Sequence, residues 1–315
     1  MSTDDRAILL VQCPDRSGIV AAVSSFLFRH GANILDFDQH TSVPRLRGAP
    51  RLRGGDAAAT LGVVGQEGSI GQEGAVFFTR VEFDTARIDL PLDDLEKAFA
   101  LDVARPYAMD WRLSRAGKKK RIAVLCSRHD HAVMELLWTW RRGELNGEVV
   151  RVISNHEDLR APIAPFGVPF DHVPVTPATK DEAEARMSAL IDGEADLLVL
   201  ARYMQILSPR LVERWRERII NIHHSFLPAF AGADPYRQAH ERGVKIVGAT
   251  AHYVTAVLDA GPIIDQDVAR VSHRDSVEDL KRLGRDLERR VLVRAVRWHC
   301  EDRVLVHGNK TVVFS

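Results

Sequence analysis

The sequence lacks the features by which nucleic-acid-binding and membrane proteins are usually recognised. Lysine plus arginine number 43 and aspartate plus glutamate also number 43, so no net positive charge would attract a polyanion. No apolar run is long enough to span a bilayer, and the acidic start, Met1 to Asp5, does not resemble a secretory signal. We therefore expect a protein that acts on small molecules, with neither nucleic acid nor membrane as partner.

Cysteine is scarce as well. The three cysteines are Cys13, Cys126 and Cys300. They are far apart and have no metal-ligand spacing, which favours a reducing, cytoplasmic location. The consecutive residues His129 to His131 look like a metal cluster, but immediate neighbours rarely supply one tetrahedral site. We therefore expect no metal and no prosthetic group.

The sequence does contain a polar pair at the end of an apolar run. Ile219 to His223 has the composition of a buried strand. Side chains alternate along a strand, so Asn221 and His223 lie on one face and the isoleucines between them on the other. Open α/β sheets bind their ligands at the carboxyl ends of strands. We therefore expect an amide and an imidazole side by side at a ligand site.

A second predicted strand, residues 245–255, leads into a turn that carries a single acid, Asp259. If the two strands are neighbours, Asn221, His223 and Asp259 form an acyl-transfer site. Asn221 would stabilise an oxyanion, an interaction worth roughly 3 kcal/mol in other enzymes. His223 would exchange protons near neutral pH, and Asp259 would orient the imidazole or position the attacking water.

Three further side chains lie close to this predicted site in the sequence. Ser225 lies past the predicted base and lacks the spacing of a nucleophile, so we expect direct attack by water or an amine. His252, in the second strand, would orient the trio or merely be buried. His224 should face away from His223, as a core residue or a loop contact.

The motifs around these residues resemble a known superfamily. They are Asn-Ile-His-x-Ser-x-Leu-Pro from Asn221, a His-Tyr-Val run from His252, and Leu-Asp-x-Gly-Pro-Ile-Ile from Leu258. Together they resemble the N10-formyltetrahydrofolate hydrolase and transformylase superfamily, and with the N-terminal segment the chain is most similar to its deformylases.

That resemblance implies that Asn221, His223 and Asp259 are catalytic and that 10-formyltetrahydrofolate is the substrate. It also implies a folate pocket that reads the pterin largely through backbone groups. The residues expected to line it are Tyr203, Met204, Gln205, Ile206 and Leu207 in one loop, and Val254, Thr255 and Leu258 in the segment that ends at Asp259.

The residues after the first strand of the second half bear on the formyl acceptor. Glycinamide-ribonucleotide transformylases carry a glycine-rich phosphate loop there, whereas Cys126 to His131 contains no glycine. The basic C-terminal domain of methionyl-tRNA formyltransferases has no counterpart either. We therefore predict hydrolysis to formate and tetrahydrofolate, which would supply formate for purine biosynthesis and balance one-carbon pools. Two alternatives are transfer to an unidentified amine and an amino-acid sensor with a decayed catalytic domain; the intact trio argues against the sensor.

The first 114 residues predict a small α+β module. Strands are expected at residues 6–13, 32–41, 76–84 and 107–113, with one helix capped by Ser17 and ended by Gly31 and another at 92–103. This β-α-β-β-α-β order is ferredoxin-like. Tandem short repeats in residues 43–74 predict a flexible insertion.

The turn Cys-Pro-Asp-Arg-Ser-Gly-Ile-Val, from Cys13, resembles an ACT domain, a module that commonly senses amino acids. Its effector loop would be Asp15, Arg16, Ser17 and Gly18, where backbone amides at a helix N-terminus could hold a carboxylate. An equally open interpretation is that the module only dimerises the chain. Either way we expect a homo-oligomer formed through the ACT domains.

A basic segment, residues 115–120, is predicted to link this module to a catalytic domain at 121–315. From Arg121 onward, strands and helices alternate, which predicts a doubly wound α/β fold with a mostly parallel, formyltransferase-like sheet. Ser208 and Ser276 are expected to begin helices, and residues 304–314 to form a hairpin. Asp234 stands where the related family usually has arginine.

Overall fold

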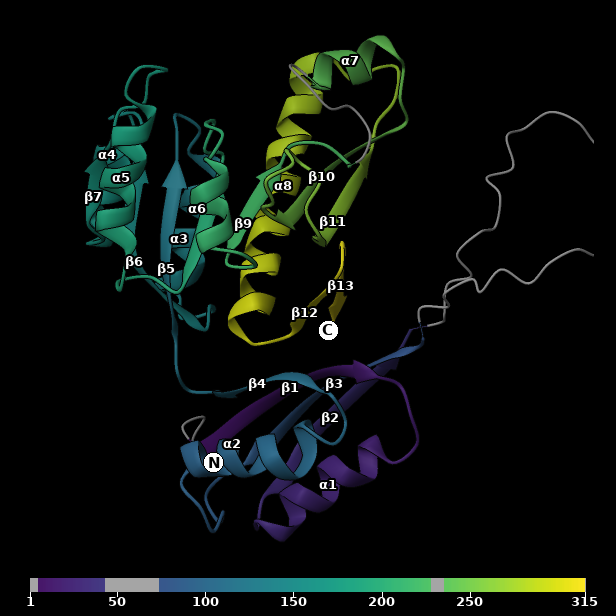
Figure 1. Cartoon of the computed structure of the whole chain (residues 1–315). Coiled ribbons are helices and arrows are strands. Elements are labelled where there is room, and N and C mark those ends of the chain that lie inside the picture. The colour runs from purple at the N-terminus through teal and green to yellow at the C-terminus, as the bar shows by residue number, and fades with distance from the viewer. Residues whose placement is uncertain (1–4, 43–73, 228–234, 315) are drawn as a thin grey trace, which may run out of the picture. The chain divides into compact units, whose positions relative to one another are not determined.

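The computed structural model describes residues 5–42, 74–227 and 235–314, and the chain divides into two compact units, Met1–Arg115 and Ala116–Ser315 (Figure 1). All but the last residue of the predicted 43–74 insertion lies outside the described residues, as does Asp234.

The first unit is a four-stranded antiparallel sheet with strand order β2-β3-β1-β4. Its elements are β1 (Arg6–Pro14), α1 (Ile19–Arg29), β2 (Asn33–Thr41), β3 (Val76–Asp84), α2 (Leu92–Phe99) and β4 (Asp110–Arg115). This order and connectivity confirm the predicted ferredoxin-like, ACT-type fold.

One face of this sheet packs on its two helices. Ala7, Leu9 and Val11 alternate along β1 into a core that also holds Phe26 of α1 and Phe99 of α2. The two phenylalanine rings meet edge to face, with centroids 5.3 Å apart, an arrangement worth about 0.5–1.5 kcal/mol beyond burial. The alternation of apolar residues along β1 therefore determines which face of the sheet packs on the helices and forms the core of the unit.

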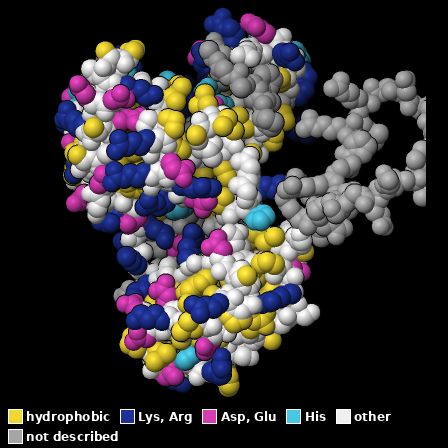
Figure 2. All heavy atoms as spheres, in the orientation of Figure 1, with side chains coloured by type: hydrophobic (Ala, Val, Ile, Leu, Met, Phe, Trp, Pro, Cys, Tyr) yellow, Lys and Arg dark blue, Asp and Glu magenta, His cyan; other side chains and the backbone are white. Residues whose placement is uncertain are grey.

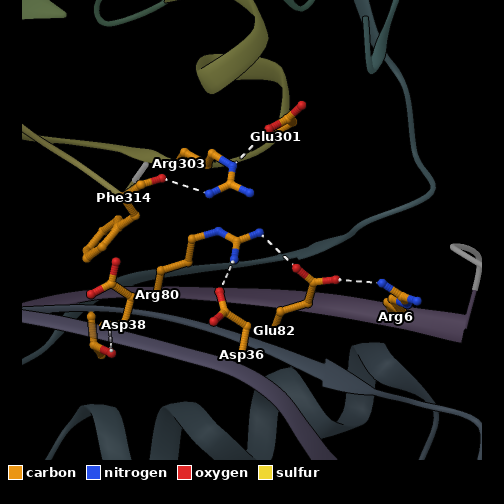
Figure 3. A network of polar contacts seen from close by, with 9 residues as sticks. Arg6, Asp36, Asp38, Arg80, Glu82, Glu301, Arg303 and Phe314 are labelled. Atoms are coloured by element: carbon orange, nitrogen blue, oxygen red, sulfur yellow. Dashed lines mark hydrogen bonds and ion pairs between the residues drawn. The ribbon is translucent and has the colours of Figure 1, made fainter. Parts of the chain in front are cut away.

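Charged side chains join the strands of the same sheet (Figure 3). Arg80 on β3 donates to Asp36 on β2 at 3.2 Å and to Glu82 at 3.1 Å, and Glu82 also accepts from Arg6 on β1 at 3.2 Å. Asp36 lies directly opposite Glu82 in the strand register, so Arg80 offsets the repulsion of two acids that face each other.

The start of α1 corrects one prediction. Gly18, at φ 93°, is the N-cap residue, and no side chain caps the helix, so the expected Ser17 cap is wrong. Glycine adopts this left-handed conformation without strain, and a Cβ here would lie 3.1 Å from the Tyr107 hydroxyl. Helix α2 continues at its C-terminal end into a π-helical turn over Ala100–Ala104. Strand β4 begins three residues later than predicted.

The second unit is built on a seven-stranded sheet with strand order β11-β10-β9-β8-β5-β6-β7. Its strands are β5 (Lys120–Cys126), β6 (Gly147–Ser154), β7 (Phe170–His172), β8 (Leu197–Ala201), β9 (Ile219–His223), β10 (Ile246–Tyr253) and β11 (Ile263–Arg270). Strands β5 to β9 all run parallel, while β10 runs antiparallel to both of its neighbours, β9 and β11. The prediction missed β7 and β11.

Helices cover both faces of this sheet (Figure 1). They are α3 (His131–Arg141), α4 (Arg160–Ile163), α5 (Lys180–Ile191), α6 (Pro209–Arg214), α7 (Pro235–Glu241) and α8 (Val277–Cys300). Along β5, Ile122 and Val124 pack with α3 and α8, whereas Ala123 and Leu125 pack with α5 and α6. The predicted doubly wound, mostly parallel fold is confirmed.

The charged surface agrees with the balanced composition. On the face that Figure 2 shows, basic and acidic side chains are interspersed over each unit. No helix in the described ranges is both long and apolar enough to cross a membrane. The chain closes with the predicted hairpin, β12 (Val304–His307) and β13 (Lys310–Val313), around Gly308 at φ 58°.

Ser276 caps α8 with the predicted capping box. Its hydroxyl accepts from the Asp279 amide at 3.2 Å, and the Asp279 carboxylate accepts from the Ser276 amide at 3.0 Å. Ser208 caps α6 through its side chain alone, accepting from the Leu211 amide, while its own amide donates to Glu184.

We predict that Ser276→Ala lowers the free energy of unfolding of the second unit by about 1 kcal/mol, because the Asp279 amide at the start of α8 loses its acceptor. Urea denaturation measures it. Ser188→Ala, within α5, is the control and should change stability by less than about 0.5 kcal/mol. Equal effects of the two substitutions would contradict the capping role.

Candidate functional site

The predicted site forms where β9 and β10 pair. The strands are antiparallel, with His223 opposite Thr250 and Asn221 opposite His252. Directly opposite residues on neighbouring strands bring their side chains together, and the Asn221 Nδ2 atom lies 3.2 Å from His252 Nε2. The expectation that the two strands are neighbours is confirmed.

Asp259 completes the trio from the turn that follows β10. Its Oδ2 atom lies 3.3 Å from His223 Nδ1 and its Oδ1 atom 3.7 Å from His252 Nε2. One carboxylate therefore faces two imidazoles. Asp259 adopts φ 53°, a left-handed conformation that aspartate tolerates better than most residues. The turn is tight at Gly261, where a Cβ would lie 1.7 Å from the Tyr253 carbonyl oxygen.

The hydrogen bonds of His252 fix the direction of the Asn221 amide. A backbone carbonyl, that of Tyr253, lies 2.9 Å from His252 Nδ1, so this nitrogen carries the proton and Nε2 accepts from Asn221. An amide group has two N–H bonds. The second N–H of Asn221 has no acceptor among the described residues and can donate to a ligand oxygen.

Asp259 is a fixed anion in this arrangement. The hydrogen bond from His223, with the second imidazole of His252 nearby, holds the pKa of its carboxyl well below the usual range, although burial opposes this. Its partner His223 is buried, and its Nε2 atom has no hydrogen-bond partner among the described residues. With Nδ1 donating to Asp259, His223 Nε2 is left to exchange a proton with a ligand.

The trio opens into a cavity of about 390 Å³, a size typical of small-molecule sites. Every residue predicted to line the folate pocket lies on its wall, namely Tyr203, Met204, Gln205, Ile206, Leu207, Val254, Thr255 and Leu258, and so does His252. Tyr203 and Leu207 are buried, whereas Ile206 and Leu258 are more than 60% exposed. The wall thus has an apolar interior and an apolar rim.

A serine that the sequence analysis did not select holds one side of the cavity in place. Ser127, just after β5, accepts from the Met204 amide at 3.0 Å and donates to the Asn155 side chain at 2.7 Å. Its position at the carboxyl end of a strand is the signal in the sequence that points to it.

The placement of His224 corrects another prediction. Strand β9 ends at His223, and the chain then bends, so strand alternation no longer holds at His224. The two imidazole centroids lie 5.1 Å apart, and His224 lines the same cavity. Burial, aided by the nearby charge of Arg202, lowers the pKa of His224 to about 4. Arg202, at φ 61°, also lines the cavity and was not predicted.

The segment His129 to His131, where we expect no metal, and the predicted effector loop, Asp15 to Gly18, are both among the described residues. His131 contacts Glu288 at 2.8 Å, and within the described ranges no three metal-ligating side chains converge. In the first unit, Asp15 donates its amide to the Ala75 carbonyl at 2.8 Å. The Arg16 guanidinium lies 4.1 Å above the Tyr107 ring. Ser17 and Gly18 follow at the start of α1.

We predict that His224 makes the folded chain less stable as the pH is lowered. Below its ordinary pKa near 6.5 the unfolded chain binds a proton that folded His224 refuses until about pH 4, so lowering the pH from 7 to 5 destabilises the fold. His224→Gln should reduce that loss by about 1–2 kcal/mol in urea denaturation.

The exposed His273 provides the matched control, and His273→Gln should leave the pH dependence unchanged. A native pH dependence retained in His224→Gln would show that His224 is not held neutral.

Comparison with known proteins agrees with both units. A formyl transferase family model matches residues 120–296 and an ACT domain model matches residues 7–56. Formyltetrahydrofolate deformylase of Mycobacterium tuberculosis is 51% identical over 97% of this chain and 90% of its own length, and that of Bacillus subtilis is 47% identical over 99% and 95%. The crystal structure of a formyltetrahydrofolate deformylase from Pseudomonas syringae pv. tomato, 46% identical, superposes with a TM-score of 0.85 over 98% of this chain and 95% of that one. With this similarity along its full length, the chain belongs to the formyltetrahydrofolate deformylase family.

Proposed function

We propose that the chain hydrolyses 10-formyltetrahydrofolate to formate and tetrahydrofolate by direct attack of water on the formyl carbon. The observation that carries the proposal is the pairing of His223 with Asp259, which leaves Nε2 beside the cavity with no hydrogen-bond partner in the part of the chain that the structure describes. Membership of the deformylase family supplies the substrate class.

The three side chains divide the work of hydrolysis. His223 Nε2 takes a proton from water as the water oxygen bonds to the formyl carbon. The free N–H of Asn221 donates to the carbonyl oxygen as it becomes an oxyanion. The proton on His223 then passes to N10, the bond between carbon and N10 breaks, and formate and tetrahydrofolate separate.

Asp259 acts through His223 in this scheme. Its depressed pKa makes it a weak proton acceptor, so the proton of the attacking water goes to His223 and Asp259 orients the imidazole. A carboxylate 3.3 Å from Nδ1 also stabilises the imidazolium that forms during the reaction.

The cavity wall suits a flat bicyclic ring with an aromatic extension. In the proposed complex the pterin lies between the loop 203–207 and the segment 254–258, where backbone groups read its edge. Met204, Ile206 and Leu258, all exposed at the rim, would cover the aromatic ring that follows. No prosthetic group enters the scheme.

Water is the favoured acceptor because the stretch after β5, where a phosphorylated amine would bind, holds the pocket loop instead. Ser127, in that stretch, holds the pocket loop through the Met204 amide, and residues 126–131 contain no glycine. The alternatives are transfer to an unphosphorylated amine and a sensor without activity; the assembled trio argues against the sensor.

Regulation belongs to the same proposal. An amino acid would bind at the Asp15 to Gly18 loop, and ACT domains would join copies of the chain into a homo-oligomer. The three free, buried cysteines agree with a cytoplasmic location, where released formate would supply purine biosynthesis.

We predict that the native chain releases formate from 10-formyltetrahydrofolate in a single turnover with no amine present. Asn221→Ala should slow release by about 10²–10³-fold, since one oxyanion donor is lost. His223→Ala should slow it by at least as much, and the exposed His273→Ala should not. A native chain that binds the folate tightly but releases no formate would contradict hydrolysis and favour the sensor or an amine acceptor.

A further inference from the structure

A buried acid lies behind the cavity and takes no part in the proposed chemistry. The side chain of Glu288, on α8, is 2% exposed. Its Oε2 atom is 2.8 Å from His131 Nε2 and 3.5 Å from Arg202 Nε, and its Oε1 atom accepts from the Tyr236 hydroxyl at 3.1 Å. Both oxygens are therefore engaged, as a buried carboxylate requires.

Glu288 is charged in this setting. Burial alone would raise the pKa of its carboxyl, but the hydrogen bond from His131 and the charge of Arg202 outweigh burial and lower it. Three elements, α3, α7 and α8, thus meet at one anion. We call His131, Tyr236 and Glu288 the Glu288 cluster.

Tyr236 links the cluster to the histidines that line the cavity. Its ring is 8% exposed and lies 6.1 Å from the ring of His224, which in turn lies 5.1 Å from that of His223. Gly284, one turn before Glu288 on α8, makes room for it, because a Cβ there would lie 1.9 Å from the Tyr236 hydroxyl oxygen. Figure 1 shows α7 beside α8, where this contact is made.

Two residues of the cavity wall lie against this cluster. Arg202 lies 3.5 Å from Glu288 and the His224 ring 6.1 Å from that of Tyr236, while Glu288 and Tyr236 themselves do not line the cavity. The trio, His252 and the folate loops, 203–207 and 254–258, form other parts of the wall. An acceptor larger than water would need space beside Asn221 and His223 that the bound folate does not take. The Glu288 cluster fills the space behind His224, so the cavity cannot extend there to hold such an acceptor.

We propose that the Glu288 cluster is a specificity-determining wall that restricts the formyl acceptor to water, with Tyr236 as the side chain that closes it. This inference rests on the proposed hydrolysis and deepens it. Attack by an amine would form a bond between formyl carbon and amine nitrogen, break the bond to N10, and send the amine proton to N10. The wall acts by denying the amine an approach to that carbon.

Removing the Tyr236 ring tests the wall. Single turnovers of 10-formyltetrahydrofolate are run with excess glycinamide, and formate and N-formylglycinamide are measured by mass spectrometry. Tyr236→Ala should raise the share of formylated amine by about tenfold or more over the native chain, because the space behind His224 opens.

Tyr236→Phe is the matched control, since it keeps the ring and loses only the hydrogen bond to Glu288. Its product ratio should equal the native one even if its rate falls, whereas a general loosening of the fold would change both variants. If Tyr236→Ala does not fold, Tyr236→Leu replaces it, because leucine keeps apolar volume but is shorter than the ring.

Two outcomes would overturn the wall. One is a product ratio in the folded Ala or Leu variant equal to that of Tyr236→Phe, and the other is a native chain that already formylates glycinamide as readily as the opened variant. Both leave formate release without amine intact. Absence of that release from the native chain would instead refute the proposed hydrolysis.

Discussion

The site depends on one carboxylate held between two imidazoles. Asp259 reaches His223 at 3.3 Å and His252 at 3.7 Å only because β9 and β10 are adjacent and antiparallel, which puts both histidines at one edge of the sheet. The left-handed conformation of Asp259 and the close approach at Gly261 then turn the acid back toward them. Backbone geometry, more than any single bond, sets the electrostatics of the site.

Two acids, the half-buried Asp259 and the buried Glu288, lie near the histidine pair. The pKa values of Asp259 and Glu288 both lie below their ordinary values, because hydrogen bonds to neighbouring histidines outweigh the cost of burial. His224 lies next to both histidine-bound acids yet is held neutral by burial and by Arg202. The fixed charges therefore lie around the reaction centre, and His223 is left to move the proton.

The sequence predicts those features of the fold and the site that depend on residues close together in the chain. Asn221 and His223 on one strand face, the Ser276 capping box and the alternating elements of both units follow from patterns within a few residues. It does not predict the Glu288 cluster, whose members come from α3, α7 and α8 and are up to 157 positions apart. Strand β11 was missed because its half-exposed sequence, Ile263–Arg270, mixes acids with apolar residues. His224 was misplaced because the bend that ends β9 at His223 has no proline or glycine to mark it.

The most direct test of the account is the pH profile of kcat/KM for formate release by the native chain and by Asp259→Asn. Asparagine keeps the size and the left-handed conformation of the aspartate but cannot hold the imidazole as an anion does. The account predicts a loss of roughly 10³–10⁴-fold across the whole profile, with folate affinity nearly unchanged. Activity within about tenfold of native would contradict it, because the carboxylate between the two imidazoles would then not be needed for the reaction.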